Sequence, residues 1–216
     1  MINCRIWRYV RRTMTSRFIR YMENNTTDHT APSASGDGTS DASLWYVLRD
    51  LTRYNAKMPG YKLLEKEGIK SFTPMHCVLR NKDGRNIRVR EPVVRSLVFA
   101  YSSKEILDTL TGMYPTLQFR YVYGKSINDP MIVPKKDMDR FIRAVESSTS
   151  EPVYYSTEEI TPDKYGREVR IIGGKLDGYT GRLLRMQGSK VKRVIVELPG
   201  FFAAGVEVRP EYIRFV

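Results

Sequence analysis

The chain has 216 residues, of which 41% are hydrophobic, and it carries a formal net charge of +12 with a pI near 9.7. This length allows one or two domains, and no stretch approaches the roughly 20 consecutive apolar residues that a membrane-spanning helix needs. The positive charge favours nucleic acids or acidic surfaces as partners. The cysteines and histidines (Cys4, Cys77, His29 and His76) are too few and too far apart for a closed zinc site, and they fit a protein of the reducing cytoplasm.

Residues 1–43 have the composition of a basic arm followed by a linker. Six arginines and no acidic residue occur in residues 1–22, and Asn, Thr, Ser, Asp and Gly dominate residues 23–43. We expect this segment to be disordered, because it offers little apolar surface to bury. Two interpretations of the arm stay open. It binds nucleic acid or a membrane surface, or it is an extension ahead of a true start at Met14 or Met22.

Residues 44–146 predict a small α/β domain. Apolar runs and helical patterns follow each other in the order β-α-β-β-β-α-β-α, which indicates a mixed sheet with helices packed on it, a ferredoxin-like layout of the α+β class. Strands are expected at Leu44–Arg49, Ile69–Arg80, Asn86–Glu91, Val93–Tyr101, Leu117–Val122 and Met131–Val133. Helices are expected at Ala56–Glu67, with the regular helix beginning at either Ala56 or Pro59, at Ser102–Leu110 with Ser102 or Ser103 as its N-cap, and at Pro134–Val145.

The turn Asn81–Arg85 carries an Asp-Gly pair between two strands, which is typical of a β-hairpin. Six basic and two acidic residues lie between Arg80 and Arg95, so we expect the hairpin to be a positively charged projection. Its cations are candidates for contact with phosphates, and the alternative is a solvated edge whose charges prevent strand aggregation. The candidates are Arg80, Lys82, Arg85, Arg88 and Arg90.

Residues 147–165 are expected to form a second linker, and residues 166–216 a small barrel. Glycines separate the apolar runs of this last segment, as turns with positive φ require. Strands are expected at Val169–Ile172, Arg182–Met186, Val191–Leu198, Phe201–Val208 and Ile213–Val216. Five short strands in about 50 residues suit an SH3-like barrel, in which closure removes exposed sheet edges.

The glycines of this segment (Gly173, Gly174, Gly178 and Gly181) and the hydrophobic residues beside them resemble a KOW motif. With the runs Trp45-Tyr46-Val47, Pro74-Met75, Glu91-Pro92 and Ile132-Val133-Pro134, they make residues 44–216 resemble NusG-type transcription elongation factors. The first domain is similar to that of RfaH, and Ser96-Leu97-Val98-Phe99 resembles more closely the UpxY antiterminators of capsular polysaccharide operons. The resemblance implies an NGN domain at 44–146, a linker at 147–165 and a KOW domain at 166–216.

The resemblance also implies a binding surface for RNA polymerase. In such factors, an apolar depression on the sheet of the first domain binds the clamp helices of the polymerase, and the bound factor suppresses pausing. The matching positions here are Val94, Leu97 and Phe99, to which we add Pro74 on a neighbouring strand and Tyr101 by strand alternation. The alternative is that these residues are ordinary core.

Further positions resemble contacts with nucleic acid or the ribosome. Arg53 and Lys57, at the start of the first expected helix, match positions that meet upstream or non-template DNA. The barrel cations Lys190, Lys192 and Arg193 are candidates for contact with RNA or a ribosomal protein, or are solvated.

We therefore expect a specialised NusG-like factor that promotes processive transcription of long operons, with capsular polysaccharide operons as its targets. Its expected partners are the polymerase clamp helices, non-template DNA or nascent leader RNA, and a ribosomal protein through the KOW domain, with no membrane. The alternatives are a ribosome-associated or RNA-binding protein that uses the barrel, and a membrane-surface or enzymatic protein. We expect no enzymatic activity, cofactor or metal, and Gly173-Gly174-Lys175 lacks the spacing of a phosphate-binding P-loop.

Overall fold

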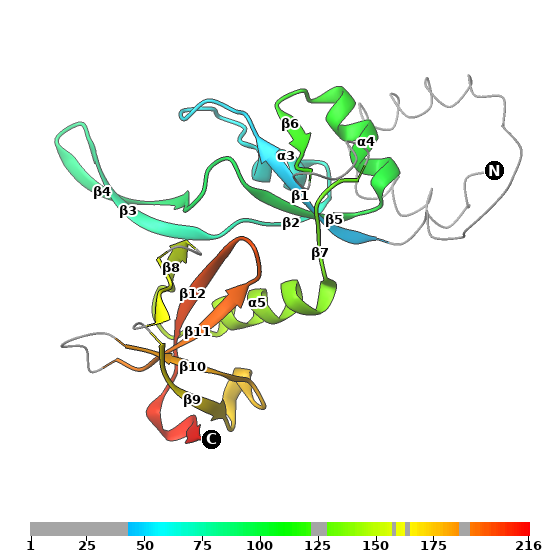
Figure 1. Cartoon of the computed structure of the whole chain (residues 1–216). Coiled ribbons are helices and arrows are strands. Elements are labelled where there is room, and N and C mark those ends of the chain that lie inside the picture. The colour runs from blue at the N-terminus through cyan, green and yellow to red at the C-terminus, as the bar shows by residue number, and fades with distance from the viewer. Residues whose placement is uncertain (1–42, 122–128, 157–158, 163–164, 186–190) are drawn as a thin grey trace, which may run out of the picture. The chain divides into compact units, whose positions relative to one another are not determined.

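The computed structural model describes residues 43–121, 129–156, 159–162, 165–185 and 191–216 (Figure 1). Lys190 and all of the predicted arm except Ser43 lie outside the described residues. The chain divides into two compact units, each built from two separate stretches of sequence. The first unit contains the described residues up to Thr73 together with Val94–Val133, and the second contains Pro74–Val93 and Pro134–Val216.

An antiparallel sheet forms the centre of the first unit. Its strands lie in the order β2 (Lys70–Phe72), β5 (Val98–Ser102), β1 (Leu44–Asp50) and β6 (Leu117–Phe119), and β7 (Ile132–Val133) also pairs with β1. The prediction of a mixed sheet is wrong, because each of these pairings is antiparallel. The reason is the strand order: β1 and β2 flank a connecting helix and would be parallel if they were neighbours, but β5 lies between them.

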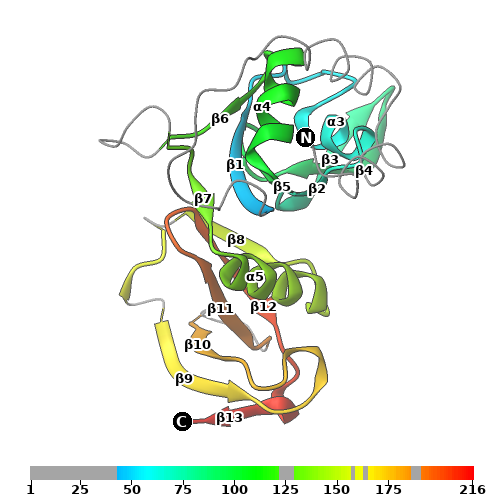
Figure 2. The ribbon, with the colours of Figure 1, turned by 90° about the vertical axis from the view of Figure 1, so that its right-hand side faces the viewer.

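Two helices, α3 (Gly60–Lys66) and α4 (Lys104–Met113), cover one face of this sheet (Figure 2). Leucines of both helices pack on alternate residues of β1 and β5, and together they form a buried core. Its members include Leu63 and Leu64, Leu107 and Leu110, Tyr46 and Leu48, and Val98 and Ala100. Because side chains alternate along a strand, the residues between these strand positions lie on the opposite face of the sheet.

The predicted helix at Ala56–Glu67 begins only at Gly60, with Pro59 as its extended N-cap. The carboxylate of Asp50 accepts hydrogen bonds from the backbone N–H groups of Thr52 (2.9 Å) and Gly60 (2.6 Å). It thereby satisfies a donor in the first helical turn that has no partner within the helix.

Turns shorten or divide two of the predicted strands. The strand expected at Val93–Tyr101 begins at Val98, because the chain turns before it and the N–H of Leu97 donates to the carbonyl of Val94 at 3.2 Å. The strand expected at Ile69–Arg80 is divided at Thr73 and Pro74, and proline lacks the N–H that a continuous ladder needs.

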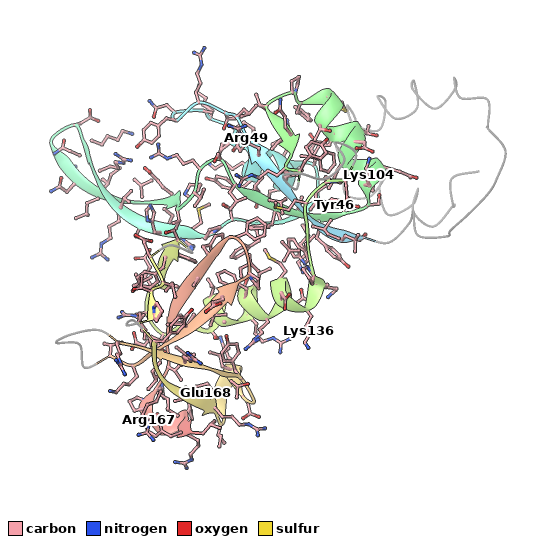
Figure 3. The ribbon with its side chains drawn as sticks, in the orientation of Figure 1. Tyr46, Arg49, Lys104, Lys136, Arg167 and Glu168 are labelled. Carbon is pink, nitrogen blue, oxygen red and sulfur yellow. The ribbon has the colours of Figure 1, made fainter. Side chains whose placement is uncertain are left out.

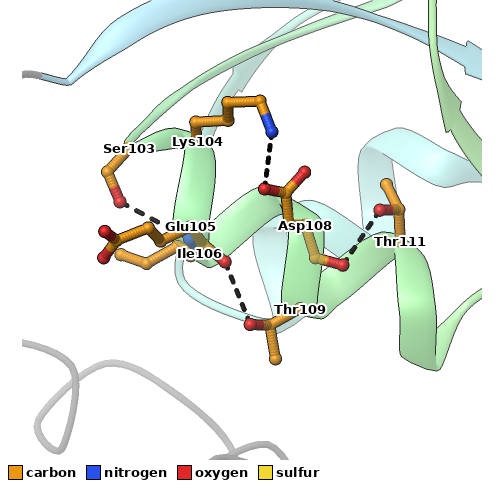
Figure 4. A network of polar contacts seen from close by, with 7 residues as sticks. All are labelled: Ser103, Lys104, Glu105, Ile106, Asp108, Thr109 and Thr111. Atoms are coloured by element: carbon orange, nitrogen blue, oxygen red, sulfur yellow. Dashed lines mark hydrogen bonds and ion pairs between the residues drawn. The ribbon is translucent and has the colours of Figure 1, made fainter. Parts of the chain in front are cut away.

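Helix α4 has the expected serine N-cap, which is Ser103. Its hydroxyl accepts a hydrogen bond from the N–H of Ile106 at 3.5 Å (Figure 4). Lys104 forms an ion pair with Asp108 at 2.7 Å on the exposed side of the helix. The hydrogen bond to Asp108 raises the pKa of the Lys104 ammonium.

The second unit contains the predicted hairpin of β3 (Met75–Lys82) and β4 (Arg85–Pro92). Its turn residues Asp83 and Gly84 have φ values of 54° and 78°. This is the conformation that the Asp-Gly pair predicts for a tight hairpin turn.

A six-stranded antiparallel sheet forms the C-terminal part of the second unit. Its strands lie in the order β13 (Ile213–Phe215), β9 (Tyr165–Ile171), β10 (Thr180–Leu184), β11 (Arg193–Leu198), β12 (Phe202–Glu207) and β8 (Val153–Ser156). The 3-10 turns η2 (Gly174–Leu176) and η3 (Pro210–Tyr212) connect them. Five of these strands correspond to predicted ones. Strand β8 lies in the predicted linker, where Val153, Tyr154 and Tyr155 supply good strand formers that pair with β12.

Helix α5 (Lys135–Ser147) belongs to the second unit and packs on its sheet. Met138, Phe141 and Ala144 are completely buried, and the ring of Phe141 meets that of Phe202 on β12 edge-on, with 5.3 Å between centroids. The sequence predicts this helix and its apolar stripe, but it places the helix in the first domain. The division of the chain into domains at residues 146 and 166 stays a prediction.

Candidate functional site

The face of the first sheet opposite α3 and α4 is apolar and aromatic, and we call it the helix-free face. Cross-strand register brings its residues together: Trp45 is opposite Tyr101, Val47 is opposite Phe99, and Phe72 is also opposite Phe99. Such neighbours on one sheet face are close enough for their side chains to interact. The helix-free face therefore combines residues of β1, β2 and β5 in one layer, in which Trp45, Val47 and Phe99 are at most 1% exposed and Phe72 and Tyr101 are half-buried.

Aromatic side chains contact one another on the helix-free face. The rings of Trp45 and Tyr101 lie 5.3 Å apart, and those of Phe72 and Phe99 lie 6.4 Å apart. The Nζ of the exposed Lys70 lies 5.4 Å from the Trp45 ring centroid and 5.7 Å from that of Tyr101. The ammonium group therefore interacts with two rings at once and places a positive charge at the edge of an apolar surface.

The predicted polymerase contacts divide into three groups. Phe99 and Leu97 are buried, with 0% and 4% of their surface exposed, whereas Tyr101 is half-buried. Val94 is 37% exposed, in the turn before β5. Pro74 is buried and begins the second unit. Phe99 and Tyr101 thus share the helix-free face, and the polymerase-binding role of all five stays a prediction.

The sequence reasoning missed three residues of the helix-free face: Trp45, Val47 and Phe72. The alternation of Trp45 and Val47 with Tyr46 and Leu48 was a usable signal, since it assigns the first pair to one face and the second pair to the other. Phe72 had no such signal, because the strand pairing that brings it opposite Phe99 is a long-range contact.

Arg53 and Lys57 are exposed and lie on the loop that precedes α3, so they are not in the first turn of a helix as expected. On the same loop, the Tyr54 ring lies under the guanidinium of Arg95, with 3.6 Å between Cζ and the ring centroid. This contact joins the loop to the turn that carries Val94. The loop therefore presents its two cations beside an ordered aromatic residue.

The hairpin cations are all exposed, but they do not share one face. Strand register places Arg88 and Arg90 on the face that also carries Leu79, and it places Arg80, Lys82 and Arg85 on the other. Arg80 forms a two-pronged ion pair with Glu91, at 3.0 Å from Nε and 2.9 Å from Nη2. Its charge is therefore partly compensated.

A half-buried tyrosine, Tyr154, lies close enough to the hairpin for the charge of Arg90 to act on it. Burial raises the pKa of Tyr154 to about 12, although the positive charge of Arg90 acts in the opposite direction. The phenol is therefore neutral at physiological pH. The Tyr154 ring also contacts Phe202 edge-on, with 6.2 Å between centroids.

Backbone conformation and close packing explain why glycine occupies these positions of the KOW-like stretch. Gly173, Gly174 and Gly178 have φ values of 91°, 69° and 78°, which only glycine adopts readily. At Gly181 a Cβ would lie 2.9 Å from a methyl group of Val194. Of the barrel cations, Lys192 is exposed and Arg193 is half-buried.

Two further features of the described residues bear on other functions. Within the described ranges, no group of three or more His, Cys, Asp or Glu side chains could hold a metal ion. None of the helices in the described part of the chain has the length and apolarity needed to cross a bilayer.

Comparison with known proteins identifies the first part of the chain. The family described as "Transcription termination factor nusG" matches residues 43–142, which cover the first unit, the hairpin and the first half of α5. Its members are not enzymes, in agreement with the sequence-based prediction. No curated protein matches the chain. A solved structure described as "Domain interaction in Thermotoga maritima NusG" is similar, with 18% identity, a TM-score of 0.42, and coverage of 81% of this chain and 97% of that one. Residues 43–142 are therefore similar to the NusG family.

Proposed function

We propose that the protein is a specialised transcription elongation and antitermination factor that binds RNA polymerase through the helix-free face of its first unit. The observation that carries the proposal is an apolar, aromatic sheet face inside the domain that the NusG family matches. Aromatic side chains are enriched at protein interfaces. The half-buried Tyr101 and the exposed Val94 lie where a partner can reach them.

The expected partner is the pair of clamp helices, which the resemblance to NusG-type factors implies. A factor bound there keeps the clamp closed and suppresses pausing. Arg53, Lys57 and the hairpin cations then contact non-template DNA or the leader RNA. Their exposure supports this assignment, because phosphate contacts need accessible guanidinium and ammonium groups.

The polymerase contact is tested by charge insertion in the full chain. Val94→Glu and Tyr101→Glu place a carboxylate on the proposed contact surface, and we expect each to weaken binding to core RNA polymerase roughly tenfold or more. Ile132→Glu is the matched control, because Ile132 is 49% exposed and its register places it on the other side of the same sheet. Unchanged binding of both contact variants, with folded protein, would remove the helix-free face as the contact surface.

We further propose that the targets are long operons, with capsular polysaccharide operons first among them. The similarity of Ser96-Leu97-Val98-Phe99 to the UpxY antiterminators supports this choice. A genome-wide map of protein occupancy on transcribed DNA tests it. Enrichment across a few long operons is expected, and an even distribution over all transcribed genes would contradict specialisation.

The second candidate function is a ribosome-associated or RNA-binding protein that acts through the C-terminal barrel. The exposed Lys192 on the strand-rich part of the second unit favours it. Copurification separates the two candidates, since a tagged protein that recovers ribosomes and no RNA polymerase would contradict the first.

A further inference from the structure

A groove lies within the second unit, between α5 and the loop that contains η2. It encloses about 420 Å³, and basic residues from both elements line it. Lys136, Arg140 and Arg143 come from α5, and Lys175 comes from η2. All four are exposed, and Figure 3 shows Lys136 on the first turn of α5. None of them belongs to the cations that the sequence analysis singled out.

The helical spacing aligns three of these cations. Lys136, Arg140 and Arg143 stand at positions i, i+4 and i+7, so they form one stripe along α5 that spans roughly 10 Å. The neighbouring stripe of Met138, Phe141 and Ala144 is buried against the sheet, which fixes the rotation of the helix about its axis. The basic stripe is therefore held in place beside η2.

The carboxylates of the groove have other partners. Asp139 forms an ion pair with Lys135, and Asp177 accepts a hydrogen bond from the backbone N–H of Gly173 at 2.6 Å. In contrast, Lys136, Arg143 and Lys175 form no ion pair among the described residues. The lining therefore has four cations against two carboxylates, of which Asp139 is already paired with Lys135, so the groove carries a net positive charge.

Arg140 is the ordered member of the stripe. Its guanidinium lies over the ring of Tyr179, with 4.2 Å between Cζ and the ring centroid, and it donates a hydrogen bond to the carbonyl of Thr180 at 2.8 Å. These contacts cover one face of the Tyr179 ring, so a nucleic-acid base cannot stack on that face. Recognition in this groove therefore relies on charge.

A second hollow of about 200 Å³ lies beside the groove, and Lys175 and Leu176 line both. Ser147, Thr149, Gly173 and Gly174 line this second hollow together with the oppositely charged Glu207 and Arg209. Two adjoining hollows with spaced cations fit a chain of phosphates better than one isolated phosphate. Walls on both sides favour a single strand over a duplex.

We infer that the groove between α5 and the Gly173–Tyr179 loop binds the phosphodiester backbone of a single-stranded nucleic acid. Lys136, Arg143 and Lys175 neutralise successive phosphates and release their counterions. RNA and single-stranded DNA share this chemistry, and both occur as single strands during transcription. The inference goes beyond the proposed function, which assigns polymerase binding to the helix-free face and nucleic-acid contacts to Arg53, Lys57 and the hairpin cations.

The test uses the full chain and fluorescence anisotropy with labelled oligonucleotides of about 12 nucleotides, as single-stranded RNA, single-stranded DNA and duplex DNA. The triple variant Lys136→Ala, Arg143→Ala, Lys175→Ala should bind either single strand at least about tenfold more weakly. Its plot of log affinity against log salt should be shallower by about 2, since each single-strand phosphate contact contributes roughly 0.7.

The matched control is the triple variant Arg170→Ala, Arg185→Ala, Arg214→Ala. It removes the same charge from exposed positions that do not line either hollow. We expect its affinity to change less than about threefold. Circular dichroism of both triple variants checks that they are folded. The affinity for core RNA polymerase should be unchanged in the groove variant, so that failure of the groove and failure of the polymerase contact are distinguishable.

Tighter binding of RNA, tighter binding of single-stranded DNA, or equal binding of both would each support the inference. The result would show which single-stranded nucleic acid the groove prefers. Two results would overturn the inference. One is an equal loss of affinity in both triple variants, and the other is duplex DNA binding as tightly as the single strands.

Discussion

Asp50 is a single residue that joins two elements of the first unit. It ends β1, it is 8% exposed, and its two carboxylate oxygens accept hydrogen bonds from Thr52 and from Gly60 at the start of α3. Gly60 fits closely beside it, because a Cβ there would lie 2.9 Å from the Asp50 carboxyl carbon and 2.8 Å from a methyl group of Leu117. The position of the Asp50 carboxylate, the start of α3 and the choice of glycine at residue 60 therefore depend on one another.

Asp50→Ala should therefore lower the free energy of unfolding by about 2–3 kcal/mol, since it leaves a buried N–H of Gly60 without an acceptor. Urea denaturation measures the change. The control is Asp108→Ala, which removes an exposed ion pair with Lys104 and should cost less than about 1 kcal/mol. An equal decrease in the free energy of unfolding in the two variants would show that the Asp50 hydrogen bonds stabilise the fold no more than an exposed ion pair does.

Tyr154 should make the second unit less stable as the pH rises into the alkaline range. Its pKa is raised from 10.0 to about 12 by burial, so the folded state retains the phenol proton more strongly than the unfolded state. The contribution is complete below the unfolded pKa of 10.0, and it is lost as the pH rises through about 12. Between a pH below 10.0 and one near 12, the wild type should lose more stability than Tyr154→Phe. Urea unfolding of both proteins measures the difference, and an identical loss would contradict it.

At the scale of elements, α5 shows how one amphipathic helix depends on its partner. Its buried stripe contacts the sheet of the second unit through Phe141 and Phe202, and Tyr154 meets the same Phe202 ring. Edge-to-face aromatic pairs contribute about 0.5–1.5 kcal/mol beyond the area they bury. The hairpin is the contrasting element, because its strands pair only with each other in the described sheet and its cations stay exposed.

A double-mutant cycle tests the contact of α5 with β12. Phe141→Ala alone should destabilise the second unit by about 3–4 kcal/mol, because Phe141 is completely buried. With Phe202→Leu, the two changes should be non-additive by about 0.5–1.5 kcal/mol. Phe119 serves as the control, because its ring packs against Tyr46 and Tyr121 in the first unit: Phe119→Leu combined with Phe141→Ala should be additive. Additivity of the Phe141 and Phe202 changes would place the helix elsewhere in solution.

At the scale of the whole molecule, the compact units and the family match divide the chain differently. The family match runs from residue 43 to 142 without a break, whereas the second unit includes the hairpin and all of α5. A chain that leaves one unit and re-enters it makes each unit depend on pairings between distant sequence segments.

Hydrogen exchange of the full chain can assign α5 to a unit. Val196→Ala creates a cavity in the buried centre of β11 and should speed amide exchange in both α5 and the C-terminal sheet. Leu64→Ala creates a matched cavity in the first core and should leave α5 protected. The opposite pattern would return α5 to the first domain, as the sequence predicts.

The sequence by itself determined the local features of this protein. The apolar run Leu44–Arg49 predicts a strand, the Asp83-Gly84 pair predicts a hairpin turn, and Ser102 or Ser103 is predicted as a helix cap. The strand and the turn are observed, and Ser103 is the cap. These features depend on short-range sterics, hydrogen bonding and periodicity. They also locate part of the candidate site, since strand alternation places Tyr101 on the same face as Phe99.

Only the tertiary structure decided which surfaces bury each other. An apolar stripe on α5 requires a partner, but it does not say that the partner is β12. The same holds for the position of β5 between β1 and β2, for Phe72 opposite Phe99, and for β8 in a segment that reads as a linker. Hydrophobic burial is non-directional, so the choice among apolar surfaces depends on the packing of the whole chain. The groove of α5 and η2 follows from that choice alone, because Lys175 lies more than 30 residues away in sequence from the three cations of α5.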